Sequence, residues 1–178
     1  MSDDGLWLGD HTPDPADERA ASDARRHRDV LGRFATGVTV VTADDDGEPV
    51  GLTCQSFSSV SLEPPLVLFC VSSSSSTWPR IRRSGHFCVN VLAADQQPLA
   101  RAMAVRGPHK FSAVDWHPGV TGSPVVAGVL AHVECRIEAV HPAGDHDVVI
   151  GRVLDLGVGS PTTPDPLLFH RGSYLSEG

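Results

Sequence analysis

Polar and apolar side chains alternate strictly between residues 132 and 139. Alternation with a period of two places successive side chains on opposite faces of a β-strand. The segment therefore predicts a strand that is buried on one face and, on the other, either wet or in contact with a second subunit. Pro142-Ala143-Gly144-Asp145 supplies turn residues directly after it, and residues 147–156 return as another apolar-rich run. Together these segments predict a long antiparallel hairpin.

A second hairpin is predicted nearer the amino terminus. Residues 38–43 and 50–55 are rich in valine and threonine, and an Asp-Asp-Asp-Gly turn at 44–47 separates them. Such a pair of runs around a short turn is typical of adjacent antiparallel strands. Further strands are predicted at residues 66–72, 86–92 and 167–169.

Three helices are expected beside these strands. The first is capped by Asp23 and stopped by Gly37, the second covers residues 77–84, and the third covers residues 95–105. One face of the third helix is expected to carry Leu99, Ala102 and Met103. Six or more strands in antiparallel hairpins, with so few helices, indicate a mainly β protein built as a closed β-barrel with peripheral helices.

Length and charge limit what the chain can do. Its 178 residues suit one folded domain, which we expect to span residues 23–178 behind a disordered acidic tail at residues 1–22. The net charge of -8 argues against nucleic acid as a partner. We expect no membrane association and a cytoplasmic location, because there is neither a basic stretch followed by an apolar run at the start nor a long apolar span. The four cysteines, at positions 54, 70, 88 and 135, stand singly and fit buried thiols rather than disulfides or zinc ligands.

The stretch from Gly51 to Pro65 crowds six serine, threonine and glutamine side chains between two apolar runs. Hydroxyls and an amide offer many hydrogen bonds with little bulk, as a polar ligand with phosphate and carbonyl groups requires. The stretch is therefore a candidate ligand cradle. Serine-rich connections also form for backbone reasons alone, so a plain loop is the alternative.

Two further features are candidate ligand contacts. Ser72 to Thr77 is a hydroxyl tract that leads into the expected helix, with Arg80, Arg82 and Arg83 close by. Hydroxyls, arginines and free N–H groups at a helix start can bind a phosphate, and the alternative is a flexible serine linker. His146, at the end of the long hairpin, could reach a ligand at the barrel rim or could simply be exposed.

Other motifs do not support catalysis by the chain's own groups. His132-Val133-Glu134 has the spacing found in zinc deaminases, but the Pro-Cys-x-x-Cys that should follow is missing, so we expect no metal. Gly157-Val158-Gly159 precedes Pro161 where a dinucleotide-binding helix should begin. No Gly-x-Ser-x-Gly occurs, and no cysteine stands in an electropositive position that would activate it.

Several segments, in one order along the chain, resemble the flavin reductase-like family. They are Phe34-Ala-Thr-Gly-Val-Thr-Val-Val-Thr42, Gly51-Leu-Thr-Cys-Gln-Ser-Phe-Ser-Ser-Val-Ser-Leu-Glu-Pro-Pro-Leu66, Phe87-Cys-Val-Asn-Val-Leu92, Ala143-Gly-Asp-His146 and Gly151. The resemblance runs from about Asp29 to Tyr174. It implies an FMN-binding split β-barrel, antiparallel and of Greek-key type. Cys54-Gln55 stands where relatives commonly have Ala-Asn, which keeps an amide but lengthens it.

The resemblance also implies roles for individual residues. His146 is expected near the nicotinamide as the catalytic-site histidine, and Lys110-Phe111 near the flavin. The side chains expected along the isoalloxazine and ribityl parts of a flavin are Thr53, Cys54, Gln55 and Ser56, and those expected near its phosphate are Ser58, Ser59, Ser75 and Thr77.

The function implied is that of an NAD(P)H:flavin oxidoreductase. Hydride would pass from NADH or NADPH to FMN or FAD, and the reduced flavin would leave for a separate oxygenase component. A homodimer is expected, since split-barrel relatives complete their flavin site at the subunit interface. Two alternatives stay open at this point: a flavin carrier or redox sensor without turnover, and a flavoenzyme that reduces its own organic substrate.

Overall fold

The protein was analysed as a computed structural model, which describes residues 15–107 and 109–175. The chain divides into two compact units, Met1–Phe34 and Ala35–Gly178. The first unit contains helix α1, Pro15–Leu31, whose described side chains are exposed. The helix begins at Pro15 rather than at Asp23, and it ends well before Gly37. Residues 15–22, which we expected in the disordered tail, are therefore helical, while residues 1–14 of that tail lie outside the described residues.

The early start of α1 has a local cause. Proline is well tolerated in the first turn of a helix, because the missing N–H would have no helical partner there. The residues that follow are rich in alanine and arginine, which favour helix. Asp23 therefore lies inside the helix instead of capping it.

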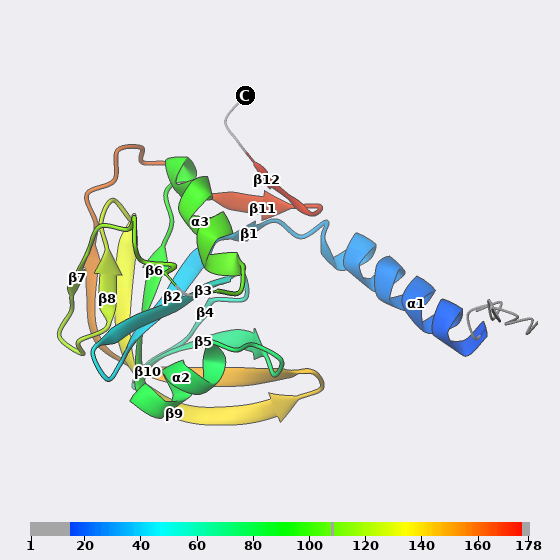
Figure 1. The fold of residues 1–178 in the computed structure, drawn as a ribbon, viewed down its shortest axis with the longest axis horizontal. Coiled ribbons are helices and arrows are strands. Elements are labelled where there is room, and N and C mark those ends of the chain that lie inside the picture. Colours follow the sequence, from blue (N-terminus) through cyan, green and yellow to red (C-terminus); the bar gives the residue numbers. More distant parts are fainter. Residues whose placement is uncertain (1–14, 108, 176–178) are drawn as a thin grey trace, which may run out of the picture. The chain divides into compact units, whose positions relative to one another are not determined.

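The second unit is built on a seven-stranded antiparallel sheet with the order β3-β2-β6-β9-β10-β5-β4. Figure 1 shows the curled sheet, whose two longest strands, β9 in yellow and β10 in orange, form one hairpin. The predicted hairpins and strands are confirmed, and the Ser58–Leu62 strand lies where the sequence suggested only a ligand cradle or loop. The strands are β2 Thr39–Asp45, β3 Glu48–Cys54, β4 Ser58–Leu62, β5 Pro65–Ser72, β6 His86–Val91, β9 Ala131–Ala143 and β10 His146–Val158.

The sheet curls but does not close. Strands β3 and β4 follow each other in sequence, yet they lie at opposite edges of the sheet and do not pair with each other within the described residues. Only residues 55–57 join them, and a chain from Cys54 to Ser58 can span at most about 14 Å. The two edges must therefore approach at this end. The expectation of a closed barrel was wrong, and the split antiparallel barrel is confirmed.

Two small sheets and three short helical segments accompany the seven-stranded sheet. The last strand expected from the sequence is part of a three-stranded sheet, and two further short strands form a separate hairpin. Helices α2 and α3 cover separate parts of the barrel (Figure 1). These elements are β1 Thr36–Gly37, α2 Trp78–Ser84, η1 Ala94–Gln96, α3 Gln97–Ala104, β7 Trp116–Pro118, β8 Pro124–Val126, β11 Leu168–His170 and β12 Ser173–Leu175.

Apolar side chains form two clusters on the two faces of β2. Val41 packs inside the barrel with Phe69 and Phe87, whose rings meet edge to face at 5.1 Å between centroids. Val40 packs on the other face with Met103 of α3. Strand β2 is thus buried on both faces, which explains its run of valines and threonines without alternation.

Helix α3 is rotated relative to the expectation. Ala100 and Met103 are buried, Leu99 is half-buried, and Ala102 is exposed. The predicted face was therefore wrong at Ala102. The short helix turns Ala100 and Met103 toward the cluster around Val40 instead.

Candidate functional site

A cleft of about 440 Å³ opens beside the end of β3 and the first residues of the link to β4. Its walls come from the end of β3, from the serine tract after β5, from the end of α3 and from the start of β10. We call it the serine cleft. It is lined by Leu52, Thr53, Cys54, Gln55, Ser56, Cys70, Val71, Ser72, Ser74, Ser75, Ser76, Thr77, Met103, Ala104, Val105, Arg106, Lys110 and His146.

Most of the residues predicted to bind a ligand meet in this cleft. They are Thr53, Cys54, Gln55, Ser56, Ser75, Thr77, Lys110 and His146. The cradle and the serine tract, which lie about twenty positions apart in sequence, thus form facing parts of one site.

Three predicted residues are placed elsewhere. Ser58 and Ser59 lie on β4 with exposed side chains, and the Ser58 hydroxyl donates to the Ser59 carbonyl. Phe111 lies behind the cleft wall, where a Cβ added to Gly51 would be 3.2 Å from its ring. Gly51 therefore leaves room for Phe111 to pack against β3. The structure does not bring these three side chains into the serine cleft.

Hydroxyl groups on the β3 side hold the wall in place. The Thr53 Oγ1 donates to the Ala100 carbonyl at 2.6 Å, which ties β3 to α3. The Ser56 Oγ donates to the Cys70 carbonyl and accepts from the Cys70 N–H. Burial raises the pKa of the Cys54 thiol, so this group stays protonated. Gln55 is exposed, and its amide has no partner among the described residues, which leaves it free for a ligand.

Hydrogen bonds within the serine tract and to its neighbours hold the tract in place. Ser75 Oγ accepts from the backbone N–H groups of Thr77 and Trp78 and so satisfies donors at the start of α2. The Ser73 N–H and hydroxyl both donate to the Asp145 carbonyl, which fixes the tract beside the β9–β10 turn. The tract is therefore an ordered wall rather than a linker.

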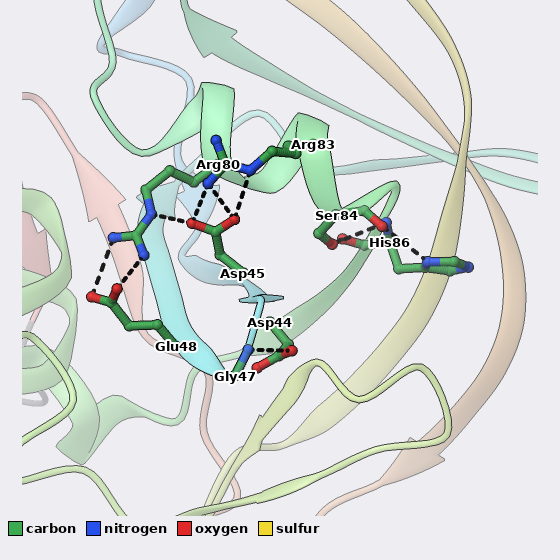
Figure 2. Close-up of polar contacts among 8 residues, drawn as sticks. All are labelled: Asp44, Asp45, Gly47, Glu48, Arg80, Arg83, Ser84 and His86. Atoms are coloured by element: carbon green, nitrogen blue, oxygen red, sulfur yellow. Dashed lines mark hydrogen bonds and ion pairs between the residues drawn. The ribbon is translucent and has the colours of Figure 1, made fainter.

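The arginines expected beside the serine tract point away from the cleft. Arg80 and Arg83 of α2 both donate to the buried Asp45 carboxylate, and Arg80 also donates to Glu48 (Figure 2). The Arg80 guanidinium holds the pKa of Asp45 below its ordinary value. Asp45 in the β2–β3 hairpin thus engages Arg80 and Arg83, and none of the three arginines expected beside the serine tract, Arg80, Arg82 and Arg83, lines the cleft.

Two other cations lie in the cleft. Arg106 Nη2 donates to the Ser74 carbonyl at 3.0 Å. Lys110 Nζ donates to the carbonyls of Gly51 and Met103 at 3.2 and 3.0 Å, and burial lowers its pKa. Neither cation pairs with a carboxylate among the residues that the structure describes. An anionic ligand would supply the missing charge.

His146 stands at the rim of the cleft. Its Nδ1 lies 2.8 Å from the Asp145 carboxylate, and its side chain is 46% exposed. The hydrogen bond to His146 lowers the pKa of Asp145, so the carboxylate is ionised at neutral pH. A carboxylate on Nδ1 fixes the ring orientation and leaves Nε2 free for a ligand.

A separate group of possible metal ligands lies on β9 and β10. One ligand atom each of His132, Glu134 and Asp155 lies within 4.8 Å of the others. Glu134 is buried, against the expectation of a wet or interfacial face, because the loop between β7 and β8 covers it. Its carboxylate accepts hydrogen bonds from the Val120 and Thr121 N–H groups and from the Thr121 hydroxyl. Glu134 therefore anchors this loop.

Comparison with known proteins identifies the family of this chain. The sequence profile of the flavin reductase-like domain matches residues 31–178. The chain belongs to the flavin reductase-like family. Of its family relatives, the reductase subunit HsaB of a flavin-dependent monooxygenase from Rhodococcus jostii is 50% identical over 94% of this chain and 85% of its own. The FMN reductase (NADH) SmoA from Agrobacterium fabrum is 44% identical over 85% and 84%.

Solved structures agree with this flavin reductase-like assignment. Nitrilotriacetate monooxygenase component B from Mycobacterium thermoresistibile has a TM-score of 0.85 and 48% identity, and the match covers 88% of this chain and 87% of that one.

The sequence did not assign Ser72, Ser74 or Arg106 individually to the site of this flavin reductase-like chain. The hydroxyl tract did point to the two serines. No sequence signal separated Arg106 from Arg80 and Arg83, because none of the three has an acid close by in the sequence and Arg80 and Arg83 meet Asp45 only in the fold.

Proposed function

We propose that the protein is a flavin reductase that uses NADH or NADPH to reduce FMN or FAD and supplies the reduced flavin to a separate monooxygenase component. The observation that carries this proposal is the serine cleft itself. It combines hydroxyl-rich walls, two cations without a paired acid among the described residues, and an oriented histidine at the rim. Relatives named as NADH-dependent flavin reductases support the same reaction.

The residues of the cleft fit a flavin. A volume of about 440 Å³ is within the range of small-molecule sites, and the lining mixes apolar groups with a few convergent polar ones. Val105, which is exposed, and the edge of Leu52 offer apolar contact to a planar ring, and the Gln55 amide can pair with ring carbonyls and N–H groups. Arg106 and the neighbouring serines can hold a phosphate.

A bound flavin supplies the redox chemistry, because it accepts a hydride from reduced nicotinamide. The chain's own residues then need to orient the two ring systems and to stabilise negative charge on the reduced flavin. Lys110 provides a partly buried positive charge for the second task. His146, held by Asp145, provides a rim contact for the nicotinamide. This division of labour explains why no acid–base dyad or activated nucleophile is needed.

The openness of the cleft supports a flavin that enters and leaves, as supply to a separate oxygenase requires. We propose a homodimer in which the second subunit covers the open side. Large apolar side chains left exposed on β4 and β10 favour such a contact, among them Leu62 and Val158, each 90% exposed. All four cysteines are free thiols, which suits the reducing cytoplasm. No described helix is long and apolar enough to cross a membrane.

Turnover with substoichiometric flavin tests the proposal. The flavin-stripped protein is mixed with NADH or NADPH and with FMN, FAD or riboflavin, and absorbance at 340 nm is followed under air. Saturable oxidation of the nicotinamide is expected, and the rates would rank the flavins and the two nucleotides. Flavin binding without oxidation would indicate a carrier or sensor, and absence of flavin binding would contradict the proposal.

A further inference from the structure

Three side chains of metal-ligand type lie together on the β9–β10 hairpin, away from the serine cleft. One ligand atom each of His132, Glu134 and Asp155 lies within 4.8 Å of the others. His132 and Glu134 are neighbours on one face of β9, and Asp155 is the direct partner of Glu134 on β10. We call these three residues the hairpin triad. Nine positions of β10 separate Asp155 from His146 at the cleft rim, which is about 30 Å of strand.

The two carboxylates of the hairpin triad lie close together without a cation. Like charges directly opposite each other on paired strands destabilise a sheet. Glu134 is only 1% exposed, and a buried carboxylate is unfavourable unless other groups compensate its charge. Neither Glu134 nor Asp155 forms an ion pair with a lysine or arginine among the described residues. The pair therefore lacks two positive charges, which is the charge of one divalent cation.

The spacing of the hairpin triad suits an ion between its members. The three side chains make no hydrogen bond or ion pair with one another within the described part of the chain. At a spacing of 4.8 Å or less, some point lies within about 2.8 Å of all three ligand atoms, and metal–nitrogen and metal–oxygen bonds to zinc are about 2.0–2.2 Å long. Movements of roughly 0.8 Å or less in each side chain would therefore bring all three to bonding distance.

Two glycines leave room for the His132 and Glu134 side chains in this arrangement. A Cβ added to Gly157, the β10 partner of His132, would lie 2.5 Å from the His132 Cε1 atom. The imidazole ring thus lies across β10 at Gly157, two positions from Asp155. A Cβ added to Gly119 would overlap the Glu134 carboxylate. Larger residues at 119 and 157 would displace both ligand groups.

The hairpin triad is open to solvent on one side. Asp155 is exposed, and His132 also lines a cavity of about 430 Å³ formed by residues of β7, β8, β9 and the end of β10. An ion can enter there, and water can complete its coordination shell. One imidazole and two carboxylates form a mixed nitrogen and oxygen ligand set, which suits divalent transition metals such as Mn²⁺, Co²⁺ and Zn²⁺.

We propose that the hairpin triad binds one divalent transition-metal ion through His132, Glu134 and Asp155, with water at the remaining positions. Glu134 also accepts hydrogen bonds from Val120 and Thr121, so the ion connects β9, β10 and the loop between β7 and β8. Its role is to stabilise this end of the barrel, and hydride transfer in the serine cleft does not need it. The expectation of no metal rested on a missing Pro-Cys-x-x-Cys, whereas Asp155 joins the triad through strand pairing.

Calorimetric titration of the EDTA-treated wild-type protein with Zn²⁺ is the first test. One ion per chain is expected to bind with a micromolar or lower Kd, and the Tm should rise with Zn²⁺ concentration because the ion binds the folded state. Co²⁺ then reports the ligand type, since nitrogen and oxygen ligands give no thiolate charge-transfer band. Absence of saturable binding, or a thiolate band from one of the cysteines, would overturn the proposal.

The second test removes single ligands. His132→Ala and Asp155→Asn should each raise the Kd for Zn²⁺ at least about tenfold. His117→Ala is the matched control, because His117 lines the same cavity but is not in the triad, and it should bind Zn²⁺ like the wild type. Glu134 is left intact because its loss would also release the loop that it anchors.

Thermal unfolding of Asp155→Asn separates metal binding from a contribution of the carboxylate to packing. Without metal, this variant should be at least as stable as the wild type, because it removes one of two opposed charges. With Zn²⁺ present, the wild type should have the higher Tm. A variant that is less stable by the same amount under both conditions would contradict the proposal.

Two further results would also overturn the proposal. Equal Kd values for Zn²⁺ in the wild type and both triad variants would indicate an adventitious ion only. NMR spectra that show His132 protonated at neutral pH, with no Zn²⁺ binding, would mean that the histidine itself supplies positive charge to the two carboxylates. NADH oxidation with added flavin is measured separately, so failure of the metal site leaves the proposed function intact, and the reverse also holds.

Discussion

The Ser56 hydroxyl makes the two hydrogen bonds to the Cys70 backbone that a paired strand would otherwise make. The pairing of Ser58 with Leu68 would put Ser56 opposite Cys70 in the next step of the β4–β5 ladder. Instead, the Ser56 Oγ accepts from the Cys70 N–H at 2.8 Å and donates to the Cys70 carbonyl at 3.1 Å. The backbone of residues 55–57 is thereby released from the sheet and can cross to β3. This bond pair fixes Ser56 and Cys70 together in the wall of the serine cleft.

Ser56→Ala should therefore loosen the cleft without removing a direct ligand contact. Loss of a hydrogen-bonded hydroxyl typically costs about 1 kcal/mol of stability. We expect the Kd values of riboflavin, FMN and FAD to rise by the same factor, because the wall and not the phosphate site is disturbed. Urea unfolding and fluorescence titration with the three flavins measure both effects. Ser58→Ala, whose hydroxyl bonds only to the neighbouring Ser59 carbonyl, is the control, and selective loss of FMN and FAD would argue for a phosphate contact by Ser56.

Lys110 should favour reduced flavin over oxidised flavin. Its ammonium is partly desolvated and bonds to two carbonyls, so a ligand with developing negative charge gains more from it than a neutral one. In Lys110→Met, the Kd for reduced FMN measured anaerobically should rise about tenfold more than the Kd for oxidised FMN. Equal effects on the two oxidation states would show that Lys110 only shapes the cleft.

Asp45 should determine part of the acid sensitivity of the barrel. Arg80 and Arg83 lower its pKa in the folded state, so the stabilisation is present above the unfolded pKa and is lost as pH falls through the lowered folded pKa. Asp45→Asn should lower the Tm at neutral pH and should weaken the dependence of Tm on pH in the acid range. Asp46→Asn is the control, because it removes the same charge at an exposed turn position that has no arginine partner among the described residues. An equal fall of Tm in the two variants would show that the ion pairs of Asp45 with Arg80 and Arg83 do not determine the acid sensitivity.

Much of the fold could be predicted from local pattern. The β2–β3 hairpin was predictable because its turn needs residues that tolerate positive φ, and Asp46 and Gly47 have φ values of 56° and 87°. The β9–β10 hairpin was predictable from alternation. Strand β4 was not, because Ser58 to Leu62 has the composition of a loop and is paired only on one side.

The failures at the site come from long-range contacts. The helix of Arg80 and Arg83 looked like a phosphate site until the barrel brought Asp45 opposite them (Figure 2). Glu134 looked like a surface residue until the loop before β8 enclosed it. Neither an ion pair between residues more than thirty positions apart nor burial by a distant loop produces a periodic pattern in the sequence, so neither could be predicted from it.

Gly151 should tolerate no side chain. A Cβ at this position would lie 2.4 Å from the Phe87 ring and 3.0 Å from the Cys135 side chain, both of which are buried. Overpacking of this kind typically costs about 1–3 kcal/mol. Gly151→Ala should therefore lower the free energy of unfolding by that amount, as measured by urea denaturation. Gly37→Ala is the control, since a Cβ at Gly37 meets nothing within 4 Å, and comparable stability of the two variants would mean that the Phe87 ring can move aside.

His146 should act on the nicotinamide and not on the flavin. The side chain stands at the rim of the serine cleft with Nδ1 held by Asp145, so Nε2 is available to a second ligand that enters after the flavin. His146→Ala should raise the KM for the nicotinamide about tenfold while the Kd for flavin stays within about twofold. Steady-state kinetics and flavin titration give the two values. His141→Ala, an exposed histidine on the same hairpin, should change neither, and an equal loss of flavin and nicotinamide binding in His146→Ala would remove His146 from this role.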